Sequence, residues 1–178
     1  MLAILYMKEI KTYNSSFFVS DQDFEKVMRY KWSRASNRYF VTQLSRTPPI
    51  SISVHRFILD AQPGQIVDHI DGNRRNNTRE NLRICTPAEN ARNSPGKYSQ
   101  YSIYKGVTYD KRRNKYVAQI TKDYKNIFLY TSTNELDCAF AYQVAAKLLF
   151  GQFHLGIDVD LPQHVKDLIT VKVTEKLA

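Results

Sequence analysis

The first sixty residues alternate between short apolar runs and turn-forming residues, a pattern typical of short strands. We expect strands at 17–19, 39–42 and 50–54, where β-branched and aromatic side chains gather. A short helix is expected between the first two strands, over about residues 21–30. This part of the chain therefore predicts a β-rich region.

The pattern changes at residue 66. Two short strands are expected at 66–69 and 82–85, with a polar loop between them. The quartet Thr86-Pro87-Ala88-Glu89 has the composition of a helix start, because its threonine can cap the helix and its glutamate can close a capping box. These residues predict a strand, a loop, a strand and a helix within about thirty residues.

A third pattern begins after residue 103. Strands are expected over 104–109, 115–121 and 126–130, and their short connections favour an antiparallel meander. Alternation along these strands divides the sheet into two faces. A helix should cover the face formed by Tyr116, Ala118, Ile120, Ile127 and Leu129. The opposite face is expected to carry Lys115, Val117, Gln119, Thr121, Asn126, Phe128 and Tyr130.

The helix expected after the third strand has recognisable ends. Ser132 and Glu135 can form its capping box, and Gly151 suits the position after its last turn. Its apolar stripe should consist of Leu136, Phe140, Val144 and Leu148.

Turn-forming residues at 93–100 separate the two patterned regions and indicate a linker. The predicted division is a first region at 1–96, a linker at 97–102, a sheet-and-helix domain at 103–157 and a tail at 158–178. Asp160 and Pro162 could cap and start one more helix in the tail.

Composition excludes several classes of protein. With 178 residues, 43% of them hydrophobic and 12% aromatic, the chain can form a packed core and is not disordered. No apolar run approaches the roughly 20 residues that span a bilayer. The two cysteines, Cys85 and Cys138, have no metal-ligand spacing and are expected to be buried apolar residues. We expect a soluble cytoplasmic protein without a membrane partner.

The positive charge is concentrated in the middle of the chain. Of the net +9, all is accounted for by residues 72–125, which hold 13 basic and 4 acidic side chains. Such a concentration is typical of proteins that bind the phosphate backbone of nucleic acids.

Four polar residues between positions 68 and 90 have a spacing that is typical of a catalytic motif. Asp68 and His69 are adjacent at a strand end, and Asn81 and Asn90 follow the histidine by 12 and 21 residues. These residues resemble the HNH nuclease family over about residues 55–93. The other positions that carry the resemblance are Val67, Ile70-Asp71-Gly72-Asn73, Asn76-Asn77, Glu80, Leu82-Arg83, Glu89 and Asn93. Many relatives carry histidine in the third position, where this chain has Asn90.

The resemblance implies a ββα-metal site with a role for each residue. His69 would be the general base, since a histidine with a pKa near ~6.5 can take a proton from water at neutral pH. Asp68 and Asn90 would hold one Mg²⁺ or Mn²⁺ ion, for which oxygen ligands are suited. Asn81 would tie the two strands together and help to orient the histidine.

Other polar residues around this motif are less specific. Four arginines in and after the loop are expected to clamp the DNA backbone, and they are Arg74, Arg75, Arg79 and Arg83. For His55 we favour a structural role or a phosphate contact over a catalytic one.

The C-terminal pattern also resembles a known family. Tyr104-Lys105-Gly106-Val107, the strand at 115–120 and the helix segment from Cys138 to Gly151 are similar to the APETALA2 (ethylene-response-factor) DNA-binding domain. The resemblance covers about residues 103–157 and implies that the uncovered sheet face enters the major groove. The positions that match its DNA contacts are Lys105, Thr108, Arg112, Arg113, Lys115, Gln119, Thr121, Asn126 and Phe128.

The expected fold is α+β: a ββα-metal HNH nuclease module with a β-rich N-terminal extension, then a three-stranded antiparallel sheet packed on one helix. The expected function is a site-specific, divalent-metal-dependent DNA endonuclease of the homing type, from a phage or a bacterium. Its partner is double-stranded DNA, with no small-molecule cofactor, and it would be a monomer or a homodimer. The alternatives are a non-catalytic DNA-binding regulator that keeps the HNH fold as a scaffold, and a nonspecific toxin-type nuclease.

Overall fold

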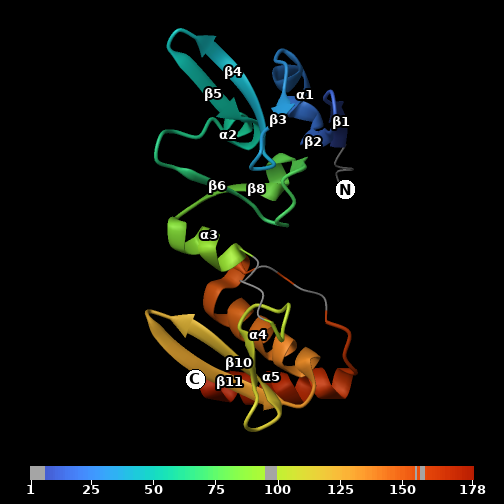
Figure 1. The fold of residues 1–178 in the computed structure, drawn as a ribbon, viewed down its shortest axis with the longest axis vertical. Helices are drawn as coiled ribbons and strands as arrows, with labels where there is room; N and C mark the ends of the chain where they lie inside the picture. The colour runs from blue at the N-terminus through green and yellow to red at the C-terminus, as the bar shows by residue number, and fades with distance from the viewer. Residues whose placement is uncertain (1–6, 95–99, 155, 157–158) are drawn as a thin grey trace. The chain divides into compact units, whose positions relative to one another are not determined.

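The computed structural model describes residues 7–94, 100–154, 156 and 159–178, and it confirms the mixed α+β class (Figure 1). The chain forms two compact units, Met1–Asn90 and Ala91–Ala178. Of the linker predicted at 97–102, residues 97–99 lie outside the described residues. No helix in the described ranges is both long enough and apolar enough to cross a bilayer.

The first unit contains three small sheets. Its elements are β1 (Met7–Lys11), β2 (Ser16–Ser20), α1 (Asp21–Met28), β3 (Ser33–Arg34), β4 (Phe40–Arg46), β5 (Pro49–Ser53), α2 (Val54–Ile58), β6 (Ile66–His69), β7 (Asn76–Asn77), the 3-10 helix η1 (Arg79–Asn81), β8 (Leu82–Cys85) and the start of α3 (Pro87–Asn93), a helix that crosses the boundary between the units. The strand orders are β1-β2-β7, β3-β4-β5 and β6-β8. The β6-β8 pair is antiparallel and precedes α3, as the sequence predicted.

One apolar core joins the N-terminal strands to the β6-β8 pair. Phe17 and Phe40 are fully buried with their ring centroids 4.6 Å apart, and Trp32 lies beside them. The same cluster includes Val67 of β6 and Leu82 of β8. The N-terminal residues are therefore part of the fold that positions β6 and β8, because a two-stranded sheet has too little apolar area to be stable alone.

Helix α3 begins where the sequence predicted. The backbone N–H and the hydroxyl of Thr86 both donate to the Glu89 carboxylate at 2.8 Å, and the Glu89 N–H donates to the Thr86 hydroxyl at 3.2 Å. This reciprocal pair satisfies N–H groups that have no partner within the helix.

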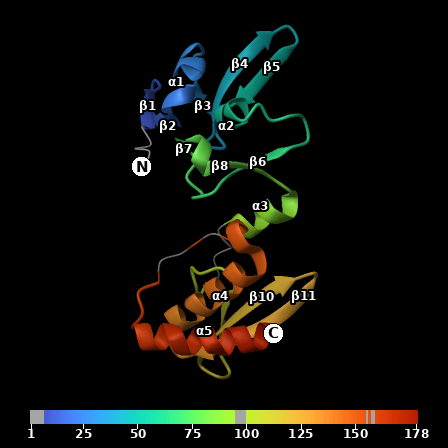
Figure 2. The same ribbon diagram turned by 180° about the vertical axis from the view of Figure 1, so that it is seen from behind.

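The second unit is a three-stranded antiparallel sheet with two helices. Its elements are β9 (Val107–Asp110), β10 (Lys115–Lys122), β11 (Lys125–Ser132), α4 (Glu135–Phe150), the 3-10 helix η2 (Gly151–Phe153) and α5 (Gln163–Leu177). The strand order is β11-β10-β9, and Figure 2 shows both helices on the same side of the sheet. As predicted, Ala118, Ile120 and Leu129 are buried beneath α4.

The details of α4 differ from the prediction. Asn134, rather than Ser132, caps it by accepting from the Leu136 N–H, and the Ser132 hydroxyl donates to Asp137 instead. The predicted apolar stripe is confirmed in part: Leu136, Phe140 and Val144 are partly buried against the core, but Leu148 is 56% exposed. The helix buries its small side chains against the sheet, namely Cys138, Ala139, Ala141, Ala145 and Ala146. Small residues allow a helix backbone to approach a sheet closely. Hydropathy alone does not show that the helix face with these small residues is the one that packs most closely on the sheet.

Two further differences concern the sheet and its cover. A β-bulge between Ala118 and Gln119 pairs Tyr130 with Ala118, so Tyr130 lies on the covered face and not on the opposite one. Helix α5 packs against α4 and β11 and buries Ile169 and Val173 in the shared core. The sheet is thus supported by two helices and not by one.

Gly106 should be intolerant of a side chain. Its φ of +72° is in the left-handed region, and an added Cβ would overlap the Tyr142 ring and lie 2.6 Å from the Gln119 carbonyl oxygen. We expect Gly106→Ala to lower the free energy of unfolding of the second unit by about 2 kcal/mol. Urea unfolding followed by circular dichroism measures it. Gly151→Ala is the matched control, since Gly151 has φ +55° and open space around it. Equal losses in both variants would contradict the role given to Tyr142.

Candidate active site

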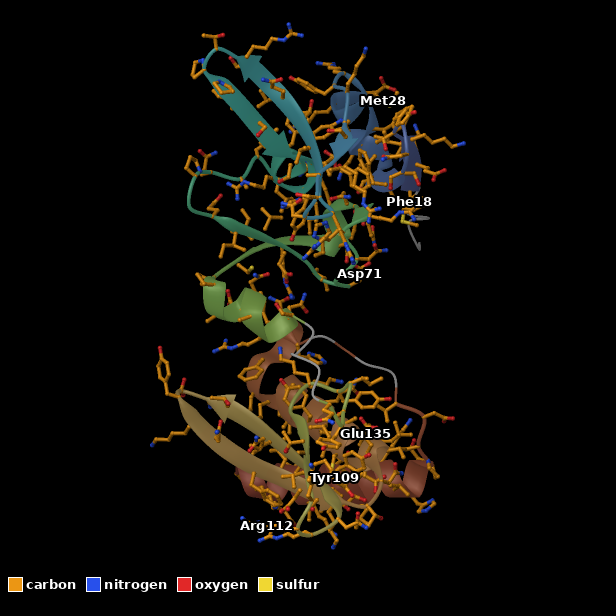
Figure 3. All side chains as sticks on the ribbon, viewed as in Figure 1. Phe18, Met28, Asp71, Tyr109, Arg112 and Glu135 are labelled. Atoms are coloured by element: carbon orange, nitrogen blue, oxygen red, sulfur yellow. The ribbon has the colours of Figure 1, made fainter. Side chains whose placement is uncertain are left out.

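The β6-β8 pair places Asp68 and His69 at the end of β6. Asp68 lies opposite Arg83 in the register, and His69 lies opposite Leu82. Both side chains are buried, and His69 is only 4% exposed. The loop that follows, in which Figure 3 labels Asp71, returns to β8 through β7 and η1.

A hydrogen bond orients the imidazole of His69. Its Nε2 lies 3.0 Å from Oδ1 of Asn77. Nδ2 of Asn77 donates to the Arg74 carbonyl at 3.1 Å, and this bond turns the amide oxygen toward the imidazole. Since an amide oxygen accepts, Nε2 carries the proton. In the neutral ring the lone pair therefore lies on Nδ1, the nitrogen that can take a proton from water.

The surroundings keep this imidazole neutral at physiological pH. Burial lowers the pKa of His69 below its ordinary value of 6.5, and this outweighs the hydrogen bond to Asn77 and the carboxylates of Asp71 and Asp68, which favour the protonated form. A histidine that acts as a base must be neutral before the reaction, so the environment suits that role.

Asn81 closes the loop between the two strands. Its Oδ1 accepts from the Asp71 N–H at 3.0 Å, while Nδ2 donates to the Asp71 carboxylate at 2.8 Å and to the Asn76 carbonyl at 2.7 Å. Its own carbonyl accepts from the Ile70 N–H at 2.8 Å. These bonds fix the backbone on both sides of His69 and bring Asn77 within reach of the ring.

The sequence prediction included Asn77 in the motif but gave it no role, and it gave the orienting role to Asn81 alone. Asn77 is fully buried, whereas Asn76 is half-buried. Two adjacent asparagines in a polar loop give no sign of which one turns inward. A parallel bridge of β7 to β2, with Asn77 opposite Val19, decides it.

Arg83 does not fit the predicted backbone clamp. Its side chain is 10% exposed, and Nε and Nη2 donate to Oδ2 of Asp68 at 2.9 and 2.7 Å. Two charge-assisted bonds to one oxygen hold the carboxylate in a fixed orientation. The prediction for Arg83 is corrected accordingly, because antiparallel pairing turns its guanidinium toward Asp68.

Two more of the predicted clamps are bonded within the first unit. Arg79 makes a two-bond contact with the buried carboxylate of Asp23, at 2.8 and 2.9 Å. Arg75 donates to the carbonyl and the hydroxyl of Ser16. Both guanidinium groups attach the loop to the N-terminal strands, which corrects the prediction for them. Arg74 also donates to a carbonyl, that of Asn37 at 2.8 Å, and it lies 4.5 Å from the centre of the Tyr39 ring. Because Arg74 is exposed, it stays a candidate for a phosphate contact.

His55 lies beside His69, with the two ring centroids 5.2 Å apart and Tyr39 next to both. Burial lowers the pKa of His55 to about 3, with a smaller contribution from His69. Its Nδ1 is buried and has no hydrogen-bond partner among the described residues. A neutral, enclosed imidazole fits the structural role and does not fit a charged phosphate contact.

The oxygen ligands suit a hard divalent cation. Asp68 offers a carboxylate, and Asn90, half-buried in the first turns of α3, offers an amide oxygen. In the described ranges, no three or more His, Cys, Asp or Glu side chains are grouped so that they could hold a metal ion among themselves. Two oxygen ligands fit an ion such as Mg²⁺, which keeps several water molecules and binds substrate phosphate.

In the second unit, the register brings most of the predicted DNA contacts onto one surface. We call it the outer face; it consists of Thr108, Lys115, Val117, Gln119, Thr121, Asn126, Phe128 and Thr131. Arg112 and Arg113 lie at the β9-β10 turn, where Figure 3 labels the first of them.

Lys105 is the exception among these predicted contacts. Its ammonium donates to the carbonyls of Ala91, Arg92 and Ser94 at 2.9, 2.9 and 2.7 Å. Burial also lowers the pKa of this amine. With three backbone acceptors, Lys105 serves the fold, and the prediction of a DNA contact is corrected.

A basic surface on the first unit was also missed. Residues 26–59 contain seven Lys or Arg and no Asp or Glu, which the count over residues 72–125 overlooked. Five of these side chains are exposed, namely Arg29, Lys31, Arg34, Arg38 and Arg46. Arg34, Arg38 and Arg46 lie on the β3-β4-β5 sheet or its turn, in which β4 and β5 extend as a hairpin (Figure 1), and Arg29 and Lys31 lie between α1 and β3. The sequence could have predicted this basic surface, because residues 26–59 carry only positive charges.

Comparison with known proteins agrees with this geometry. A family model described as HNH endonuclease matches residues 54–92. An uncharacterised HNH endonuclease of Acanthamoeba polyphaga mimivirus is 32% identical over 145 residues, which cover 80% of this chain and 75% of that protein. Protein 3.8 of Escherichia phage T7 is 37% identical over 62 residues, covering 35% of this chain and 51% of that protein. No solved structure matches.

The mimivirus relative matters most here, because the similarity extends well beyond the motif itself. It reaches across four fifths of this chain. Together with the buried His69 at the end of β6 and the match over residues 54–92, this similarity shows that the chain belongs to the HNH endonuclease family.

Proposed function

We propose that this protein is a site-specific, divalent-metal-dependent DNA endonuclease in which His69 is the general base. The observation that carries the proposal is the buried, neutral imidazole whose Nε2 is bonded to Asn77, which leaves the lone pair on Nδ1. A base held in one tautomer and one orientation is what hydrolysis of a phosphodiester requires from a protein side chain.

The reaction proposed is attack of water on the scissile phosphorus. Nδ1 of His69 takes the proton of the water as the new P–O bond forms and the bond to the leaving oxygen breaks. Asp68 and Asn90 would hold one Mg²⁺ or Mn²⁺ ion, which when bound neutralises charge on the phosphate and the leaving oxygen. Arg83 holds the Asp68 carboxylate in place, and Asn81 holds the loop that carries Asn77.

Selection of the target is assigned to the second unit. The outer face resembles the DNA-reading surface of APETALA2-like domains, and it offers Gln119, Thr121 and Asn126 for base contacts, with Arg112 and Arg113 at one end. A β-sheet of this kind can enter the major groove. In this proposal residues 103–157 form the reading domain, 97–102 the linker and 158–178 an added tail.

The exposed basic side chains on the β3-β4-β5 sheet of the first unit would add contacts to the DNA backbone. Arg34 and Arg46 border β4 and β5, and Arg74 extends the basic surface at the loop after β6. Two modest DNA surfaces on one chain raise the affinity for DNA through effective concentration. We propose a homing-type enzyme because a nonspecific nuclease would not need a second domain that reads DNA.

Cleavage of supercoiled plasmid DNA tests the proposal. We expect relaxation or linearisation of a pool containing phage and bacterial DNA in the presence of Mg²⁺ or Mn²⁺, and its loss on addition of EDTA. The form of the product distinguishes nicking from double-strand cleavage. Cleavage that persists in EDTA would contradict the metal dependence.

The alternative is a DNA-binding regulator that does not cleave. The ion pair between Asp68 and Arg83 favours it, because that contact gives the carboxylate a structural partner. Specific binding to duplex DNA without cleavage under Mg²⁺ or Mn²⁺ would support the regulator and overturn the nuclease.

A further inference from the structure

Helix α5 brings two lysines to the edge of the sheet in the second unit. Lys172 and Lys176 are one helical turn apart, so they lie on the same face of the helix. Nζ of Lys176 is 4.1 Å from the centre of the Phe128 ring, and Nζ of Lys172 is 5.6 Å from that of Tyr130. Both rings belong to β11, the edge strand, against which α5 packs.

Phe128 links this edge to the outer face. It pairs with Gln119 on β10, and its ring is 47% exposed even though Lys176 lies over it. The aromatic ring therefore holds an ammonium group at the border of the surface assigned to DNA. Cation–π contacts of this kind position a lysine without neutralising its charge.

Among the described residues, no carboxylate is paired with either ammonium group. Both lysines are exposed, and neither forms an ion pair with a carboxylate in the described part of the chain. By contrast, Lys8 and Lys26 of the first unit each pair with an aspartate. Positive charge that is oriented but unpaired is available to an external anion.

Arginine and lysine side chains border the outer face on three sides. Arg112 and Arg113 lie at the β9-β10 turn, and Lys122 and Lys125 lie at the β10-β11 turn. The lysines of α5 occupy the long side along β11. A duplex that lies across the sheet would place phosphates near these borders, while the amide and hydroxyl groups between them face the bases.

We propose that Lys172 and Lys176 bind backbone phosphates of duplex DNA, so that α5 is part of the DNA-binding surface. This inference rests on the proposed function. A lysine is a flexible point charge, which suits phosphate contacts that set the register without reading the sequence. The tail would then have a binding role, although its sequence shows no motif for one.

The test is equilibrium binding of the full-length chain to duplex DNA over a range of salt concentrations. We expect Lys172→Ala with Lys176→Ala to lower the slope of log K against log salt by about 1.8, or about 0.9 for each contact. The affinity at 0.1 M salt should fall by about tenfold or more. Lys172→Arg with Lys176→Arg should retain the wild-type slope, because the charges remain.

Lys147→Ala with Lys166→Ala is the matched control. It removes the same amount of charge, one lysine from α4 and one from α5, and Lys166 lies over Phe140 instead of a ring on β11. We expect its slope to equal the wild-type slope. A slope unchanged in the Lys172 and Lys176 variant, or reduced equally in the control, overturns this inference alone. A wild-type protein that binds no duplex DNA overturns the proposed function as well.

Discussion

Replacing His69 with alanine should lower the rate of plasmid cleavage by about 10²- to 10⁴-fold, the contribution expected of a positioned general base. The variant lacks the imidazole that Asn77 orients, so the attacking water loses its proton acceptor. The measurement is single-turnover cleavage with the enzyme in excess over DNA, so that binding does not limit the rate. DNA affinity, measured separately, should stay at the wild-type value.

His164→Ala is the control for this variant. His164 is exposed on α5, in the second unit. The His164→Ala variant should therefore cleave DNA at the wild-type rate. If His69→Ala cleaves as fast as wild type, the assignment of the base is wrong. If neither protein cleaves but both bind DNA, the regulator is the better description.

The pH dependence of the wild-type rate follows from the same imidazole. Burial lowers the pKa of His69 below 6.5, so the ring is already neutral at pH 7 and the rate should not increase further above it on account of this group. On acidification the rate should fall only when the pH drops below that lowered pKa, as the base becomes protonated. A rate that falls between pH 8 and 7 would show that another group controls it.

The largest expected loss of stability comes from Arg79→Met, at about 3 kcal/mol. The variant leaves the Asp23 carboxylate, which is 2% exposed, without the two hydrogen bonds from the guanidinium. It also removes the bond to the Ile58 carbonyl at 3.0 Å. The single tryptophan, Trp32, is buried in the same core, so its fluorescence during urea unfolding reports the first unit.

Arg46→Met is the matched control, since Arg46 is exposed and forms no ion pair among the described residues. It should change the free energy of unfolding by less than about 0.5 kcal/mol. The double variant Asp23→Asn with Arg79→Met should recover part of the loss, because the buried group is then uncharged. Equal stability of Arg79→Met and wild type would contradict a structural role for this arginine.

Local sequence signals predicted local structure well. The strands at Ile66–His69 and Leu82–Cys85 have the predicted bounds, and the Thr86 and Glu89 capping box is present. These features depend on residues within a few positions of one another, so propensity and short-range hydrogen bonds suffice. The face of α4 was predicted only in part, because its most buried side chains are small ones, while Leu136, Phe140 and Val144 of the predicted stripe are partly buried and Leu148 is exposed.

Side-chain partners distant in sequence were not predictable in the same way. Arg75, Arg79 and Arg83 share a basic segment with Arg74, and composition alone gives all four the same role. Arg75 and Arg79 bind Ser16 and Asp23, which are more than fifty residues away, and only folding brings them together. Arg83 binds Asp68, fifteen residues away across the β6-β8 pair. The β-bulge that moves Tyr130 to the covered face is likewise a matter of strand pairing.

The sequence by itself determined the family motif, the catalytic candidates and the order of the elements, because these depend on residue type and spacing. The tertiary structure alone decided which nitrogen of His69 holds the lone pair, since the hydrogen bond that Nε2 donates to Asn77 sets the tautomer. It also decided which basic side chains remain available for DNA. A buried carboxylate or carbonyl must be satisfied within the fold, so it binds the nearest cation, and only the cations left exposed can bind phosphate.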